Sequence, residues 1–115
     1  MAFTTAGTAT AVVSHRSQFQ SLWSANYAIS ITGVNPANIA AGAEDTQTYT
    51  VAGLALGDVV LGISLSVDQT VDGDISAYVS AANTLTIRIS NLNGASGLDY
   101  AAGTTIKVLI GRPAF

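Results

Sequence analysis

The chain has 115 residues, a length that fits one domain, and it contains no cysteine, which excludes disulfides and thiolate metal sites. Only 10% of the residues are charged, whereas about 25% are charged in ordinary soluble domains. The net charge is −3 and the four basic residues are far apart in the sequence, which argues against nucleic-acid binding, because phosphate contacts need clustered Lys and Arg.

Small residues, chiefly alanine, glycine, serine and threonine, take the place of the missing charges. A monomer normally covers itself with charged side chains, so this composition suggests that another protein covers part of the surface. A soluble monomer with a surface rich in threonine, serine and alanine is the alternative.

The chain contains no segment that reads as a targeting or membrane-spanning element. Its first residues, "MAFTTAGTATAVV", have no basic group ahead of the apolar stretch and so do not resemble a signal peptide. The longest apolar stretch, residues 51–67, carries Asp58 and three glycines, and it is too short and interrupted to cross a bilayer. We therefore expect no membrane partner.

The first 24 residues differ from the remainder of the chain. Residues 1–14 offer few large side chains for burial, which favours an extended arm over a packed element. In "HRSQFQSLWS" (15–24), Phe19, Leu22 and Trp23 have the i, i+3, i+4 spacing of a short helical turn, but an extended anchoring segment fits equally well. We treat 1–24 as an N-terminal arm and anchoring segment.

From residue 27 onward, short runs alternate between apolar and polar residues and are separated by turn signals such as Asp72-Gly73 and Asn93-Gly94. No stretch has a helical period. The pattern predicts an all-β fold, a single antiparallel β-sandwich of jelly-roll-like form over residues 25–115, with the extended arm ahead of it. The predicted strands are 27–32, 46–52, 58–68, 75–80, 84–91 and 104–111.

The alternation also predicts which side chains face the core between the two sheets. These side chains are mostly aliphatic. The predicted inward set is Ile29, Ile31, Tyr49, Val51, Val59, Leu61, Ile63, Leu65, Ile75, Val79, Leu85, Ile87, Ile89, Ile106, Val108 and Ile110.

The sequence contains no recognisable catalytic motif. His15 is the single histidine, so it has no second histidine or cysteine with which to form a transition-metal site. Neither a nucleophile elbow nor a phosphate-binding loop is present, and we expect no enzyme activity and no cofactor.

Two groups of residues suggest ligand binding as an alternative to a structural role. Asp68, Asp72 and Asp74 could bind calcium, although their spacing does not match a D-x-D-x-D-G loop and a solvated turn explains them equally well. Phe19, Trp23 and Tyr27 could stack on a sugar, but such residues more often anchor a segment to a core or a neighbour. The final "GRPAF" is either a frayed tail or a small hook into a partner.

Three short stretches stand out after residue 44: Gly-Asp-Val-Val at 57–60, Val-Ser-Ala-x-Asn at 79–83, and Asp-x-Ala-Ala-Gly-Thr at 99–104. Together they resemble a small β-sandwich module that is common in virion proteins of tailed bacteriophages, including capsid decoration proteins, head fibres, knobs and some tail-fibre ends. The resemblance covers roughly residues 44–110 and rests on structural turns. It implies a binding or cementing part that is usually oligomeric and has no enzyme activity.

This resemblance implies a capsid decoration, or cement, protein on the outer surface of a phage head. Its expected partners are the major capsid protein and further copies of itself, as a homotrimer at a local threefold axis. Within the arm, Phe19, Leu22 and Trp23 would be the anchors and Arg16 a charge partner. The alternatives are a head-fibre, knob or tail-tip protein that contacts host glycans, or a free carbohydrate- or calcium-binding module.

Overall fold

The alternating sequence folds into strands throughout. The computed structural model describes residues 2–14, 22–36, 38–68 and 72–115, and these residues form seven strands. None of them belongs to a helix long and apolar enough to cross a membrane. The strands are β1 (Thr8–Ser14), β2 (Trp23–Val34), β3 (Glu44–Thr50), β4 (Val59–Leu65), β5 (Gly73–Ala81), β6 (Thr84–Asn91) and β7 (Thr104–Pro113).

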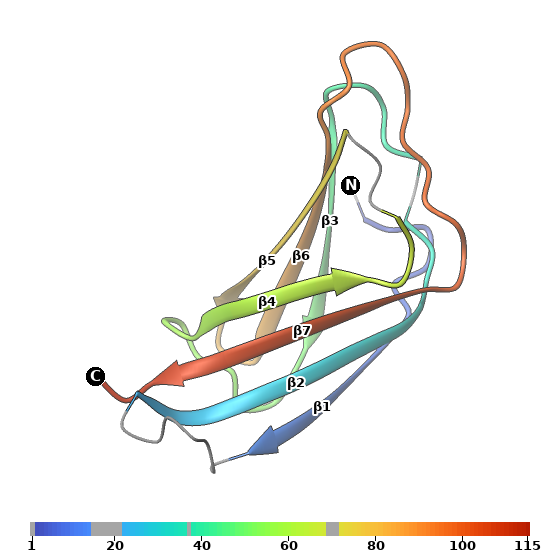
Figure 1. Cartoon of the computed structure of the whole chain (residues 1–115). Coiled ribbons are helices and arrows are strands. Elements are labelled where there is room, and N and C mark those ends of the chain that lie inside the picture. Colours follow the sequence, from blue (N-terminus) through green and yellow to red (C-terminus); the bar gives the residue numbers. More distant parts are fainter. Residues whose placement is uncertain (1, 15–21, 37, 69–71) are drawn as a thin grey trace.

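The strands form two antiparallel sheets that pack face to face. One sheet has the order β1-β2-β7-β4 and the other has the order β3-β6-β5. In Figure 1 the first sheet crosses in front of the second. The chain changes sheet at each step from β2 to β5 and again between β6 and β7, an alternation typical of jelly rolls. The predicted antiparallel β-sandwich is therefore confirmed.

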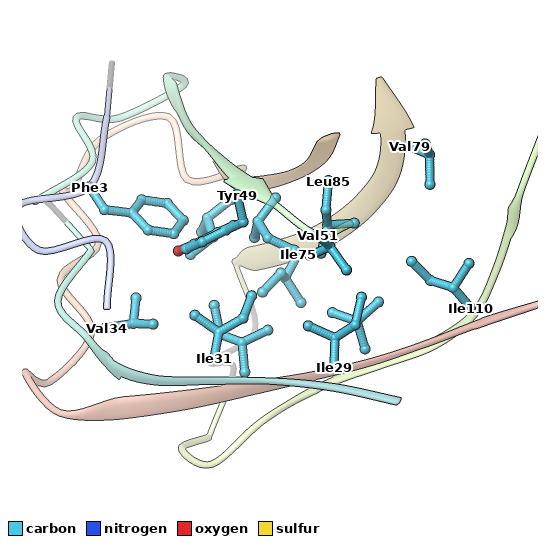
Figure 2. Close-up of a cluster of buried hydrophobic side chains, with 14 of the residues drawn as sticks. Phe3, Ile29, Ile31, Val34, Tyr49, Val51, Ile75, Val79, Leu85 and Ile110 are labelled. Carbon is cyan, nitrogen blue, oxygen red and sulfur yellow. The ribbon is translucent and has the colours of Figure 1, made fainter. Parts of the chain in front are cut away.

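The core lies between the sheets and is mostly aliphatic. Figure 2 shows Ile29 and Ile31 of β2 pointing toward Tyr49 and Leu85 of the opposite sheet. All the residues predicted to face inward outside β4 are buried. Each such side chain contributes about 1.5–3 kcal/mol on full burial, so the burial of these side chains between the two sheets is the main source of stability.

The prediction for β4 is wrong at two positions. Val59 and Leu61 were expected in the core, but both are exposed, at 40% and 42%. Val60 pairs with Ile110 and Gly62 with Leu109, which leaves Leu61 as an extra residue on β4. This β-bulge shifts the alternation by one residue, so Val60 and Ile63 are the side chains that pack against the core.

The amino-terminal residues contribute to the sandwich. Residues 8–14 form the extended strand β1, and all seven of them pair with β2 without a register shift. Phe3 is buried beside the core, and the Tyr49 hydroxyl donates a 2.7 Å hydrogen bond to the Ala6 carbonyl. The boundary between an arm and the sandwich at residue 25 stays a prediction, and part of the arm, 15–21, lies outside the described residues.

The hairpin between β5 and β6 depends on Asn83, the last residue of the Val-Ser-Ala-x-Asn stretch. Asn83 has a φ of 59°, a left-handed conformation that asparagine tolerates better than most residues. Its side-chain Oδ1 accepts a 2.8 Å hydrogen bond from the Gly53 amide, and its own amide donates to the Leu54 carbonyl. One residue therefore closes the hairpin and holds the 51–54 loop.

Candidate interaction surface

An exposed apolar row crosses the outer face of the four-stranded sheet. The strand registers place Val12 beside Ala28, Ala28 beside Leu109, and Leu109 at the β4 bulge next to Leu61. Val12 is 71% exposed, Leu109 46% and Leu61 42%, and Ala28 is also exposed. The row therefore joins one residue from each strand into a continuous apolar strip on the surface.

The strip has small polar neighbours and few charges. The adjacent row along the strands reads Thr10, Ser30, Lys107 and Ser64, in which Lys107 is the single charged residue. A shallow hollow of about 330 Å³ lies between Val12, Ala28, Lys107 and Leu109. Because few ions would lose hydration on contact, this face suits burial against another protein better than an ordinary charged surface does.

The predicted anchors have different outcomes. Arg16 and Phe19 lie outside the described residues, so their role stays a prediction. Leu22 is exposed, and its carbonyl accepts a 2.7 Å hydrogen bond from the Ala114 amide. Trp23 begins β2 in an extended conformation, and its ring meets the ring of Phe115 edge-on with centroids 6.3 Å apart. The structure therefore brings Leu22 and Trp23 together with the end of the chain.

An ion pair that the sequence analysis did not predict organises this same end of the sandwich. The Arg112 guanidinium donates to both carboxylate oxygens of Asp58, at 2.9 and 2.8 Å, and to the Gly53 carbonyl at 2.6 Å. Asp58 also accepts a 3.0 Å hydrogen bond from the Ala55 amide. These contacts attach the 53–58 loop to the end of β7.

Burial and hydrogen bonding act in opposite directions on the pKa of Asp58. Its side chain is almost fully buried, which alone would raise the pKa, but hydrogen bonds from Arg112 and Ala55 and the Arg112 charge together hold it below the ordinary value. The pKa of Arg112 is raised, mainly by its hydrogen bonds to Asp58. The pair is thus fully ionised near neutral pH and serves as a structural clamp.

A shallow, open depression of about 380 Å³ lies next to this clamp. Leu56, Pro113 and Phe115 supply its apolar walls, and Asp58 and Arg112 supply its polar side. Leu56 and Phe115 are among the most exposed large hydrophobic residues that the structure describes. This end of the sandwich therefore presents a second apolar surface, distinct from the strip across the sheet.

Neither sugar stacking nor calcium binding, the two ligand-binding alternatives, is supported by an assembled site among the described residues. Tyr27 lies in the core, with the Arg112 guanidinium 5.8 Å from its ring centre, so its face is unavailable to a sugar. Asp72 accepts a 3.0 Å hydrogen bond from the Asn93 side chain. Within the described ranges, no three His, Cys, Asp or Glu side chains are grouped to hold a metal ion.

Comparisons of the chain with protein-family models, with curated proteins and with solved structures gave no match.

Proposed function

We propose that the chain is a virion structural protein of the capsid-decoration type, which binds the outer shell of a phage head as a homo-oligomer. The observation that carries this proposal is the apolar strip formed by Val12, Ala28, Leu61 and Leu109 across the four-stranded sheet. This face is nearly uncharged, and its neighbouring row has Lys107 as its single charged residue, which suits adhesion to another protein.

The physical role follows from mass action. A protein that binds the assembled shell, and not its free subunits, stabilises the assembled state in proportion to its occupancy. A sandwich with an aliphatic core between its two sheets holds the backbone of its outer face in place, so little conformational entropy is lost on docking. The major capsid protein is the partner that the strip would contact.

The end of the sandwich offers a second contact. Leu22, Leu56 and Phe115 are exposed beside the Arg112–Asp58 clamp, and the clamp fixes the 53–58 loop that carries Leu56. With the strip on one face and this cluster at one end, the chain has two separate apolar contacts, as a protein that spans a joint between shell subunits requires.

Binding to phage heads that lack the protein tests the proposal. Leu109→Glu places a charge in the centre of the strip, and we expect it to weaken binding at least about tenfold, because the charge must be desolvated at the interface. Leu92→Glu is the matched control, since Leu92 is 68% exposed but follows β6 in a loop outside the strip. Equal binding by both variants and the wild type would show that the strip does not contact the phage head.

The number of copies in purified virions provides the independent check. A decoration protein is present in many copies on each head, whereas a fibre or tail-tip protein is present in a few. Densitometry of the virion proteins therefore separates the proposal from the rival location, and a low copy number would refute it.

A further inference from the structure

The described residues leave four strand edges, and three of them carry features that discourage pairing with another chain. The β3 edge has Glu44 and the inward-pointing Asp45, and the β5 edge has Asp74 and an extra residue at Ser80. The β4 edge has the bulge at Leu61. Charges and bulges of this kind are how folded proteins protect an exposed edge from unwanted strand pairing.

The fourth edge, β1, has none of these features. Its sequence, TATAVVS, contains no charge, no proline and no glycine, and its register with β2 is uninterrupted. Four of its seven residues are β-branched, so they favour the extended conformation. Among the described residues, no second strand pairs with the backbone of residues 8–13 on the side away from β2.

Six of the seven residues of β1 are exposed, on both faces of the sheet, and Ala9 is partly buried against the core. Val12 and Val13 point to opposite sides of the sheet, because neighbours in a strand alternate, yet both are exposed. Val13 lies in register with the buried Tyr27, so it is on the inner face, at a place that the three-stranded sheet does not cover. An apolar side chain on each face and an unguarded backbone edge coincide on one strand.

We propose that β1 pairs antiparallel with β1 of a second copy of this chain, joining the two four-stranded sheets into one continuous sheet across a twofold axis. The occupant is a second copy because such pairing is self-complementary: a twofold axis presents the same edge on both sides. Although the chain has a net charge of −3, β1 carries none, so two copies meet at this edge without direct like-charge repulsion.

The pairing also extends the apolar strip. Val12 is the end residue of the strip at the β1 edge, so two paired copies place their strips end to end on one face. The paired edge over residues 8–13 is about 20 Å long and buries about 200 Å² per copy, well below the roughly 800 Å² per partner of a standard interface. We therefore expect a dimer that depends on concentration.

The proposal goes beyond the proposed function and sets the oligomer as two chains, in place of the three implied by the resemblance. Light scattering across a concentration series tests it on the full chain. The wild type should reach the mass of two 11.7-kDa chains, and Val12→Lys should shift the midpoint at least about tenfold to higher concentration. Leu92→Lys, equally exposed but remote from β1, should behave as the wild type.

Single cysteines give a second test that does not depend on tolerating a charge. The chain has no cysteine of its own, so one introduced between residues 9 and 13 can form a disulfide only with another copy. Oxidation should yield a covalent dimer, strongest at the position nearest the axis and weaker on either side of it. The Leu92→Cys variant should remain monomeric under the same oxidation.

Three results would overturn the pairing: a monomer at every concentration, a mass of three chains, or a dimer that Val12→Lys leaves intact while cysteines in β1 fail to join copies. None of these results bears on binding of a single copy to a phage head. Conversely, a β1-paired dimer that binds no head would refute the proposed function alone.

Discussion

Arg112 and Asp58 are joined at two points, from Nε to Oδ1 at 2.9 Å and from Nη2 to Oδ2 at 2.8 Å. A guanidinium and a carboxylate in this parallel arrangement form one of the strongest polar contacts in proteins. Here the contact connects the loop before β4 to the end of β7, with Asp58 buried and Arg112 partly exposed. The end of the sandwich therefore has a fixed shape.

Asp58→Asn should lower the free energy of unfolding by about 2 kcal/mol at neutral pH, because it removes a charged acceptor from a buried, bidentate contact. Urea denaturation measures this loss. Asp99→Asn, at an exposed position, is the control and should stay within about 0.5 kcal/mol of the wild type. Similar small effects at both positions would mean that the clamp contributes little.

The contribution of Asp58 should also depend on pH. Because its pKa is lowered in the folded state, its stabilising effect is present above the ordinary aspartate pKa of about 3.9 and is lost as the pH falls through the lower folded value. The difference in stability between the wild type and Asp58→Asn should therefore shrink in acid. A difference that persists unchanged below this range would assign the effect to packing.

Asp45 is expected to behave in the opposite way. Its side chain is fully buried, and neither carboxylate oxygen has a hydrogen-bond partner among the described residues, so burial raises its pKa, while the positive charge of the N-terminus acts in the opposite direction. Asp45→Asn should therefore increase the free energy of unfolding at neutral pH by about 1 kcal/mol, since it removes a buried charge that accepts no hydrogen bond from the described residues. Thermal denaturation at pH 7 measures the gain.

The sign of the pH dependence checks the explanation for Asp45. With a raised folded pKa, the penalty is absent below about pH 3.9, where Asp45 is protonated in both states, and grows as the pH rises through the folded value. The advantage of Asp45→Asn should vanish in acid. Glu44→Gln, at the exposed neighbouring position, should show no comparable gain. A loss of stability at pH 7 for Asp45→Asn would contradict the account.

Trp23 provides a spectroscopic test of the end of the sandwich. A Cβ added at Gly111 would lie 2.7 Å from Cε3 of the Trp23 ring, so Gly111→Ala must displace the indole or shift β7. Because Trp23 is the only tryptophan, its fluorescence maximum should move to longer wavelength as the ring gains contact with water. Gly62→Ala, where the added Cβ meets open space, should leave the spectrum unchanged.

Two variants separate the backbone and side-chain roles of Asn83. Asn83→Ala loses the hydrogen bond to the Gly53 amide and places alanine at a φ of 59°, so we expect a loss of about 2 kcal/mol. Asn83→Gly loses the same hydrogen bond but adopts that φ without strain, so its loss should be about 1 kcal/mol smaller. Equal losses in chemical denaturation would rule out backbone strain at the turn.

Local alternation was sufficient to predict the six strands β2 to β7 and the inward faces of all but β4. It failed at Val59 and Leu61 because a bulge changes the phase of a strand without changing its composition, and the Gly62 beside it is a weak signal. It also missed β1, since a run of Thr, Ala and Val is compatible with an unpacked arm until a partner strand such as β2 is known.

The contacts between loops and the Arg112–Asp58 clamp could not be predicted from short stretches of the sequence. Ile39 and Leu98 are buried because the two loops that carry them form a β-bridge with each other, a contact set by the fold and not by either loop alone. Arg112 and Asp58, 54 residues apart in the sequence, are likewise brought together by the pairing of β4 with β7, in which Val59 lies opposite Gly111. The one available hint was the Gly57-Asp58 strand entry, which indicated a turn and gave no partner for the carboxylate.

The position of β7 has a consequence for biosynthesis. In the four-stranded sheet, β7 lies between β2 and β4 and pairs with both, yet the ribosome makes it after all the other strands. Until β7 emerges, the strand that lies between β2 and β4 is missing, and so are the buried side chains that it contributes to the middle of that sheet. The sandwich must therefore close late, after translation of the whole domain, and a nascent chain stalled before residue 104 should be open to proteases and chaperones.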